Sequence, residues 1–345
     1  MSDVKEQQEE EEEKDLRSVL VTSVLTLEKI DQGLYRGSHP WVPRSNTLFG
    51  GQIVGQALVA AGLTVGKGLH AHSLHCYFVR PGDPRVPVLY QVDLVRDGRS
   101  FSVRSVRAVQ HGLAIFVCQA SFQLDQPSPM EHQCCMPEAP LPESLLTWAE
   151  LIDKAMRDPL LSERHRLGLS KILAKDVPIE IRPVLPIDYV PGTPLEPRQL
   201  FWVRAKGHIG EGDMNMHRCV AAYISDYSFV RTAWHPHVRM PMRSMASLDH
   251  SLWFHAPFRA DEWMLYECES PWAGWRTADH RGRRWNGLHE RGDDHGEDLR
   301  PDGSSRGLVL GRLWRRDGTL AVSCAQEGVF RLRQKTPGAV PASKL

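Results

Sequence analysis

The sequence lacks a net charge, a long apolar run and a secretory leader. Lys and Arg together number 42, as do Asp and Glu, so the formal net charge is zero and no broad surface for nucleic acid is expected. No apolar stretch approaches the roughly 20 residues of a transmembrane helix, so no membrane span is predicted. The first residues, MSDVKEQQEEEEEKD, are mostly acidic, which indicates a disordered leader rather than a signal peptide.

Spaced cysteine motifs are absent as well. Most of the seven cysteines lie in apolar segments, a placement typical of buried thiols in a reducing compartment. Cys134 and Cys135 are adjacent but have no spaced partners, so no zinc site is predicted. The sequence also contains no G-x-S-x-G segment, which argues against a serine hydrolase of the α/β type.

One motif is present twice. The stretch HSLHCYFVRPGD, which begins at His72, is followed much later by HSLWFHAPFRAD, which begins at His250. After a two-residue deletion Tyr90 aligns with Tyr266, and further on Cys118 aligns with Cys324. The order of the blocks is the same in both copies, so the sequence predicts a duplication of a whole domain.

Each copy is predicted to be a helix followed by antiparallel strands. In the first copy residues 48–65 are apolar and rich in Ala and Gly, as in a helix buried on nearly all sides. Asp97 and Gly98 between two β-rich runs indicate a hairpin. In the second copy the helix is expected at 216–229 and the first strand at 177–184. A long helix wrapped by a curved antiparallel sheet is a hotdog unit, so we predict an α+β double hotdog.

The repeat also predicts the boundaries. Some thirty extra residues separate Tyr266 from Cys324, and 275–303 is rich in Arg, Asp, Gly and His without a strand period. We interpret this segment as a disordered insertion at a hairpin tip. The predicted parts are a leader (1–15), an N-terminal hotdog (16–123), a linker with surface helices (124–175), a C-terminal hotdog (176–333) and a flexible tail (334–345).

Five segments together resemble the type II acyl-coenzyme A thioesterases: LFGGQIVGQAL, HSLHCYFVRPGD, AAYISDYSF, SLDHSLWFHAPFRAD and CAQEGVFR. The resemblance covers roughly residues 16–345 apart from the insertion. It implies a double hotdog that hydrolyses acyl-CoA to free acid and CoA without a metal or redox cofactor. It also implies that Asp226, Ser247 and Gln326 bind and orient the attacking water, with no covalent acyl-enzyme. We further expect a homo-oligomer.

The residues themselves give partial support to these roles. Asp226 is the only ionisable group in CVAAYISDYSF, and a carboxylate in an apolar helix costs desolvation unless it has partners. In the first copy Gly50, Gly51 and Gln52 mark a helix start whose N–H groups could polarise the thioester carbonyl. Alternatively, the two glycines only allow a tight start of the helix.

Other readings stay open. The strand histidines 72, 75, 250 and 255 are interpreted as core residues rather than as metal ligands, because no carboxylate-rich ligand set accompanies them. A double-hotdog enoyl-CoA hydratase would need an Asp/His pair, and Asp226 has no His in its motif. A third alternative is an acyl-CoA-binding protein that has lost turnover, because the insertion could displace the strand carrying Gln326.

The chain ends in Ser343, Lys344 and Leu345. This tripeptide is the peroxisomal address when it stands at a free C-terminus. We therefore expect a location in the peroxisomal matrix, with the import receptor as a partner alongside the acyl-CoA substrates.

Overall fold

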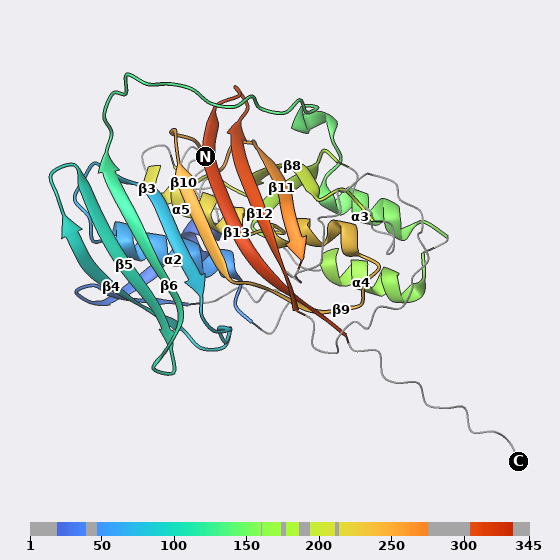
Figure 1. The fold of residues 1–345 in the computed structure, drawn as a ribbon, viewed down its shortest axis with the longest axis horizontal. Helices are drawn as coiled ribbons and strands as arrows, with labels where there is room; N and C mark the ends of the chain where they lie inside the picture. The colour runs from blue at the N-terminus through green and yellow to red at the C-terminus, as the bar shows by residue number, and fades with distance from the viewer. Residues whose placement is uncertain are drawn as a thin grey trace, which may run out of the picture.

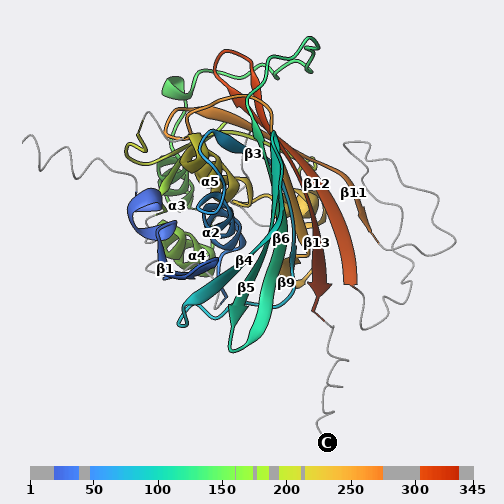
Figure 2. The same ribbon diagram turned by 90° about the vertical axis from the view of Figure 1, so that its left-hand side faces the viewer.

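A computed structural model describes residues 19–38, 47–159, 161–173, 177–185, 194–210, 214–274 and 304–333. The predicted leader, insertion and C-terminal tripeptide lie outside these residues. One thirteen-stranded antiparallel sheet curves around two central helices (Figures 1 and 2). This architecture confirms the predicted double hotdog.

Both units contain two strands, a long helix and four further strands in that order, with a short helix added before the first unit and a short helix and a strand added after the long helix of the second. The first contains the short helix η1 (Leu20–Val24), β1 (Leu27–Asp31), β2 (Leu34–Gly37), α2 (Gly50–Gly62), β3 (Leu69–Phe78), β4 (Val88–Asp97), β5 (Phe101–Gln110) and β6 (Leu113–Leu124). The second contains β7 (Ile179–Pro183), β8 (Arg198–Ala205), α5 (Met214–Ser225), η3 (Val230–His237), β9 (Met242–Ser247), β10 (Asp249–Phe254), β11 (Met264–Gly274), β12 (Ser304–Arg315) and β13 (Leu320–Leu332).

The sheet runs β1-β2-β4-β5-β6-β3 and continues β10-β13-β12-β11-β8-β7, with β9 paired to β13. The second half therefore mirrors the first, and β3 and β10 join the two units at the centre. Both helices lie on the concave side, and nearly all residues of α2 and α5 are buried. Their Ala and Gly residues fit this position, because small side chains let the helices and the sheet approach closely.

The ladder corrects one part of the predicted register. Cys118 of β6 faces Cys76 of β3, whereas Cys324 of β13 faces Leu252 of β10. Since Cys118 and Cys324 correspond, Leu252 corresponds to Cys76 and not to the Leu74 of the repeated His-Ser-Leu. The structural alignment of the two units therefore differs by two positions from the alignment of the identical His-Ser-Leu letters. The letters match by coincidence of strand composition, since both registers direct the same residues inward.

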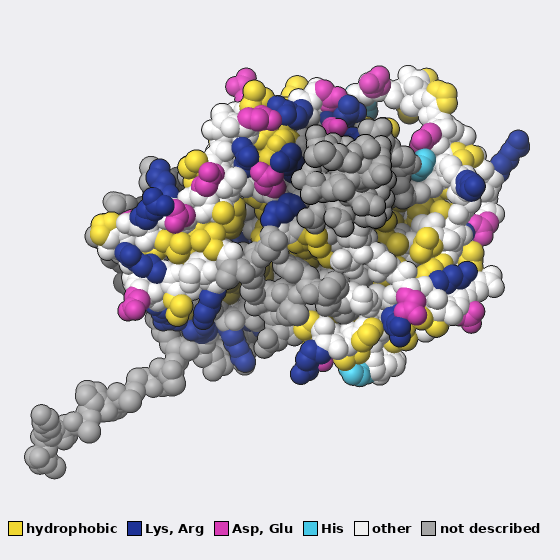
Figure 3. Space-filling view, turned by 180° about the vertical axis from the view of Figure 1, so that it is seen from behind, with side chains coloured by type: hydrophobic (Ala, Val, Ile, Leu, Met, Phe, Trp, Pro, Cys, Tyr) yellow, Lys and Arg dark blue, Asp and Glu magenta, His cyan; other side chains and the backbone are white. Residues whose placement is uncertain are grey.

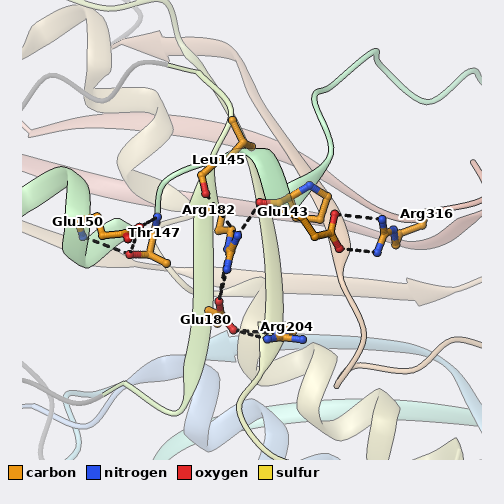
Figure 4. A network of polar contacts seen from close by, with 9 residues as sticks. Glu143, Leu145, Thr147, Glu150, Glu180, Arg182, Arg204 and Arg316 are labelled. Atoms are coloured by element: carbon orange, nitrogen blue, oxygen red, sulfur yellow. Dashed lines mark hydrogen bonds and ion pairs between the residues drawn. The ribbon is translucent and has the colours of Figure 1, made fainter.

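The linker folds against the second unit. It contains η2 (Pro142–Ser144), α3 (Trp148–Met156) and α4 (Glu163–Leu173), the last two being helices that the apolar spacing predicts. Trp202 Nε1 donates to the carbonyl of Pro140 at 2.8 Å. Arg182 donates to the carbonyl of Pro142, and Arg316 forms an ion pair with Glu143 (Figure 4). These contacts place the linker over the outer face of β7, β8 and β12.

Strands β11 and β12 remain paired on both sides of residues 275–303. Gly274 at the end of β11 faces Arg306 of β12, and Ala273 faces Gly307. In the first unit the same position is the turn after Asp97, where β4 and β5 form the predicted hairpin. The described strands therefore keep their antiparallel pairing up to the point where the extra residues begin.

Charges of both signs are scattered over the face opposite that of Figure 1 (Figure 3). This distribution agrees with the equal numbers of acidic and basic residues. Within the described ranges, no helix has the length and apolar character needed to cross a membrane.

Candidate active site

The carboxylate of Asp226 lies where the end of α5 meets the start of α2. Helix α5 ends at Ser225, so Asp226 directly follows the helix and is not inside it, as the predicted span of 216–229 had implied. Its Oδ2 atom accepts the backbone N–H of Gly51 at 2.8 Å. Its Oδ1 atom accepts Nε2 of Gln326 at 2.6 Å. The structure thus brings together residues from both units that are far apart in the sequence.

The two glycines at the start of α2 are needed for this approach. A Cβ atom on Gly50 would lie 2.7 Å from Asp226 Oδ2, and one on Gly51 would lie 2.4 Å from the carbonyl oxygen of Tyr223. The first contact is to the end of a side chain, whereas the second is to backbone that cannot move aside. Both close contacts agree with the alternative of a tight helix start.

The N–H of Gly51 donates to the carboxylate, whereas the sequence predicts that this segment polarises the thioester carbonyl. A donor already paired with Asp226 is not free for the oxygen of a thioester. The positive end of the α2 dipole instead acts on Asp226, where it favours the ionised form. The third member of the segment, Gln52, has a fully buried side chain on the first turn of α2.

Burial dominates the electrostatics of the carboxylate. Desolvation raises the pKa of Asp226 from its ordinary 3.8 to about 6, although the hydrogen bonds from Gln326 and Gly51 lower it. The side chain is still partly exposed, so solvent reaches it. A carboxylate with a pKa near 6 is ionised at neutral pH and is a better proton acceptor than an ordinary Asp.

The side-chain amide of Gln326 is hydrogen-bonded through its nitrogen to the carboxylate of Asp226. Its side chain is fully buried on β13, and its backbone faces Val309 of β12. While Nε2 donates to Asp226, the buried Oε1 atom has no hydrogen-bond partner in the described part of the chain. Oε1 is therefore an acceptor available to a water molecule or a substrate beside Asp226.

Ser247 lies on β9, next to the strand that carries Gln326, but outside the hydrogen-bonded pair of Asp226 and Gln326. It is the last residue of β9 and faces Gly328, two residues beyond Gln326. Within the ranges that the structure describes, its hydroxyl forms no hydrogen bond to Asp226 or Gln326. The structure therefore brings Asp226, Gln326 and Gly51 into direct contact and leaves Ser247 as a neighbour.

Asp249, a residue not singled out from the sequence, fixes the strand beside the site. The chain bends between β9 and β10, and the ladder to β13 is interrupted there. Leu248 N–H donates to the carbonyl of Glu327, and Asp249 Oδ1 accepts the N–H of Glu327 at 2.7 Å. The Asp in the motif ASLDHS was the only signal for it. Without a predicted strand break its carboxylate had no apparent task.

The strand histidines have structural partners. Each of the four forms a hydrogen bond with a serine hydroxyl: His72 with Ser121, His75 with Ser251, His250 with Ser225 and His255 with Ser323. Burial lowers the pKa of His250 to about 3, so this ring is neutral. The interpretation as a core residue is confirmed for His250 alone, because His72 is half-buried and His75 and His255 are exposed, and all four have hydroxyl partners instead of backbone ones. The described residues contain no cluster of three or more His, Cys, Asp or Glu that could hold a metal.

Two curved hotdog units, with the partly buried carboxylate of Asp226 where their helices meet, define the class of hotdog-fold thioesterase-like proteins. Two family profiles match the chain: "Acyl-CoA thioesterase N-terminal domain" over residues 38–123 and "Acyl-CoA thioesterase" over 170–298. The chain belongs to the acyl-CoA thioesterase family.

Individual relatives agree with this assignment. Acyl-coenzyme A thioesterase 8 of Mus musculus is 60% identical over 92% of this chain and 91% of its own length. The peroxisomal acyl-coenzyme A thioester hydrolase 1 of Saccharomyces cerevisiae is 26% identical over 67% of this chain and 78% of its own length. Among solved structures, the acyl-CoA thioesterase II TesB2 from Mycobacterium marinum is 32% identical with a TM-score of 0.63, covering 90% of this chain and 97% of that one.

Proposed function

We propose that this protein hydrolyses acyl-CoA thioesters to free fatty acid and CoA, with Asp226 as the general base. The observation that carries the proposal is the partly buried carboxylate, whose pKa is about 6 and whose two oxygens are held by Gln326 and Gly51. A thioester needs a positioned water and a base, because thiolate is a good leaving group. The family membership gives the substrate class.

In the proposed reaction Asp226 accepts a proton from a water molecule as the water oxygen bonds to the thioester carbonyl carbon. The tetrahedral intermediate then collapses, the carbon–sulfur bond breaks, and the CoA sulfur takes up the proton held by Asp226, which restores the carboxylate. Gln326 Oε1 accepts a hydrogen bond from the second hydrogen of the water. The Ser247 hydroxyl, at the end of β9, is proposed to bind the same water. No side chain forms a bond to the acyl group. Hydroxylamine should therefore trap no acyl-enzyme during turnover.

Measuring free thiol separates this proposal from its alternatives. Hydrolysis releases one CoA thiol for each acyl-CoA consumed, whereas hydration of an enoyl-CoA or simple binding releases none. The hydratase alternative also lacks support from the site, because Asp226 is paired with Gln326 and Gly51, and the neutral His250 is bonded to Ser225. Absence of thiol release across a panel of acyl chain lengths would refute the proposal.

The alternative of an impaired binding protein depended on displacement of Gln326 by the insertion. Val309 of β12 faces Gln326, and β12 pairs with β11 as far as Gly274. These pairings support a site that keeps its register beside residues 275–303. Turnover is therefore the function that the geometry supports best.

We infer a peroxisomal location, supported by the sequence Ser343-Lys344-Leu345 and by the name of the yeast relative, a peroxisomal acyl-coenzyme A thioester hydrolase. The import receptor would bind this tripeptide as the last residues of the chain. Deleting it should leave purified protein active but cytosolic when it is expressed in cells. Continued import would require a second signal or an imported partner chain.

The proposal of a homo-oligomer is tested by the mass of the purified protein in solution.

A further inference from the structure

The internal repeat assigns a counterpart to each strand residue of the candidate site. Cys118 corresponds to Cys324, so two residues further along Ala120 corresponds to Gln326. Four residues along, Phe122 corresponds to Gly328. Gly328 faces Ser247 across the ladder, and Phe122 faces Ala71. Ala71 therefore corresponds to Ser247.

The helices complete the correspondence. Counted from the first residue of each helix, Gly62 at the end of α2 corresponds to Asp226 after α5. A close contact between the helices agrees, because a Cβ atom on Gly55 would lie 3.1 Å from the carbonyl oxygen of Cys219, and these two residues correspond to one another. The first unit thus has Gly and Ala where the second has Asp, Ser and Gln.

A cavity of about 160 Å³ occupies this second position. It lies between the end of α2 and the start of α5, at the opposite end of the helix pair from Asp226. Its lining includes two of the counterparts, Gly62 and Ala71, and is otherwise mainly apolar. Residues from both helices and from the sheet line it, among them Gly62, Ala71, Phe122, Asn215, Met216 and Cys219.

The loss of the polar side chains explains both the cavity and its character. A Cβ atom added to Gly62 would meet no atom within 4 Å, so the space that Asp226 fills in the other site is open here. Asn215, the polar amide of the lining, already has hydrogen-bond partners. It donates to the carbonyl of Leu69 and contacts His70, each at 3.3 Å. The interior therefore offers apolar surface and no carboxylate that could activate water.

We propose that this cavity is a second, non-hydrolytic site that takes up the hydrocarbon chain of an acyl ligand. The nature of the ligand rests on the proposed function. The volume fits part of such a chain, because an engineered apolar cavity of about 150 Å³ in another protein binds benzene. A chain bound here is retained and not cleaved, since Gly62 replaces the base and Ala71 and Ala120 replace the groups assigned to the water.

Decanoate is a suitable probe, and the full-length protein is used throughout. Equilibrium dialysis counts the decanoate bound by wild type, by Gly62→Leu and by Gly168→Leu. The first substitution places a side chain in the cavity. The second is a matched Gly-to-Leu change on the exposed face of α4, where an added Cβ also meets nothing within 4 Å. Gly62→Leu should bind one decanoate fewer than wild type, and Gly168→Leu should bind the wild-type number.

Two results would overturn the proposal. One is an unchanged decanoate count in a folded Gly62→Leu protein, with folding checked by circular dichroism. The other is a loss of thiol release in parallel with the lost decanoate, which would mean that the missing ligand had occupied the catalytic site.

The thiol of Cys219 supplies a local readout. Methyl methanethiosulfonate modifies cysteines, and peptide mass spectrometry follows each one separately. Decanoate should slow the modification of Cys219, which lines the cavity, and should leave the buried Cys268 of β11 unaffected. Equal protection of both thiols, or of neither, would contradict binding in the cavity.

An Asp226→Asn background separates this proposal from the proposed function. That variant should lose thiol release and still show protection of Cys219 by decanoate. If thiol release persists, the catalytic assignment fails while the cavity result stands by itself. Repeating the measurement with decanoyl-CoA in this background shows whether a free acid or an intact thioester is the better ligand.

Discussion

Replacing Asp226 with Asn should stop catalysis and stabilise the fold at the same time. Asn has the same shape but stays neutral at every pH. Its Oδ1 atom can accept the N–H of Gly51, and its Nδ2 atom can donate to Gln326 Oε1 once that amide turns over. The turn replaces the bond from Nε2 with a bond to Oε1 and moves Nε2 to the position where Oε1 had no partner in the described part of the chain. The variant therefore removes a charge while the number of unpartnered amide atoms stays the same.

The magnitude follows from the raised pKa. A carboxyl group whose pKa is about 6 in the folded state and 3.8 in its ordinary state binds its proton more tightly when folded. Its contribution to stability is complete below about pH 4 and is lost as the pH rises through 6. Two pKa units correspond to about 3 kcal/mol, so ionisation lowers the free energy of unfolding by about that amount at pH 8. Asp226→Asn does not pay this cost.

Urea unfolding at pH 4 and at pH 8 measures the effect. The variant should match wild type within about 1 kcal/mol at pH 4 and exceed it by about 3 kcal/mol at pH 8. Asp317→Asn is a control of opposite sign, because backbone and side-chain hydrogen bonds from Thr319 lower the pKa of that exposed carboxyl. It should be destabilised at pH 8. A stability difference for Asp226→Asn that does not change with pH would refute the reasoning.

The other predictions concern the same site. For wild type, kcat/KM should rise about tenfold per pH unit below 6 and level off above it, as expected for a base with that pKa. Gln326→Ala and Ser247→Ala should each lower thiol release about 10- to 1,000-fold, and the double variant should lose less than the product, because both residues are assigned to one water. Gly51→Ala should lower the free energy of unfolding by about 1–3 kcal/mol in urea, since its methyl group would press on the Tyr223 carbonyl. Excision of 275–303 should change thiol release by less than about tenfold, because loop closure depends weakly on length; a gain of several orders of magnitude would instead mean that the segment disables the site.

The sequence by itself determined the fold class. The repeated blocks, the Ala- and Gly-rich helix segments and the Asp97-Gly98 turn each act locally, so their consequences can be read without a structure. The same holds for the surface helices of the linker, whose apolar residues recur with helical spacing. Family motifs then placed Asp226 and Gln326 among the site candidates.

Only the tertiary structure decided the alignment of the two units, the hydrogen-bond partner of Gly51 and the pKa of Asp226. The His-Ser-Leu letters misaligned the two copies by two positions, because a shift of two keeps the same strand face inward and composition cannot reveal it. The hydrogen-bond partner of Gly51 was also beyond the reach of the sequence. Whether its N–H is free depends on a carboxylate from the other unit, which reaches it only when the two helices pack together. The raised pKa of Asp226 also arises from that packing, since desolvation is a property of the assembled surroundings and not of the residue.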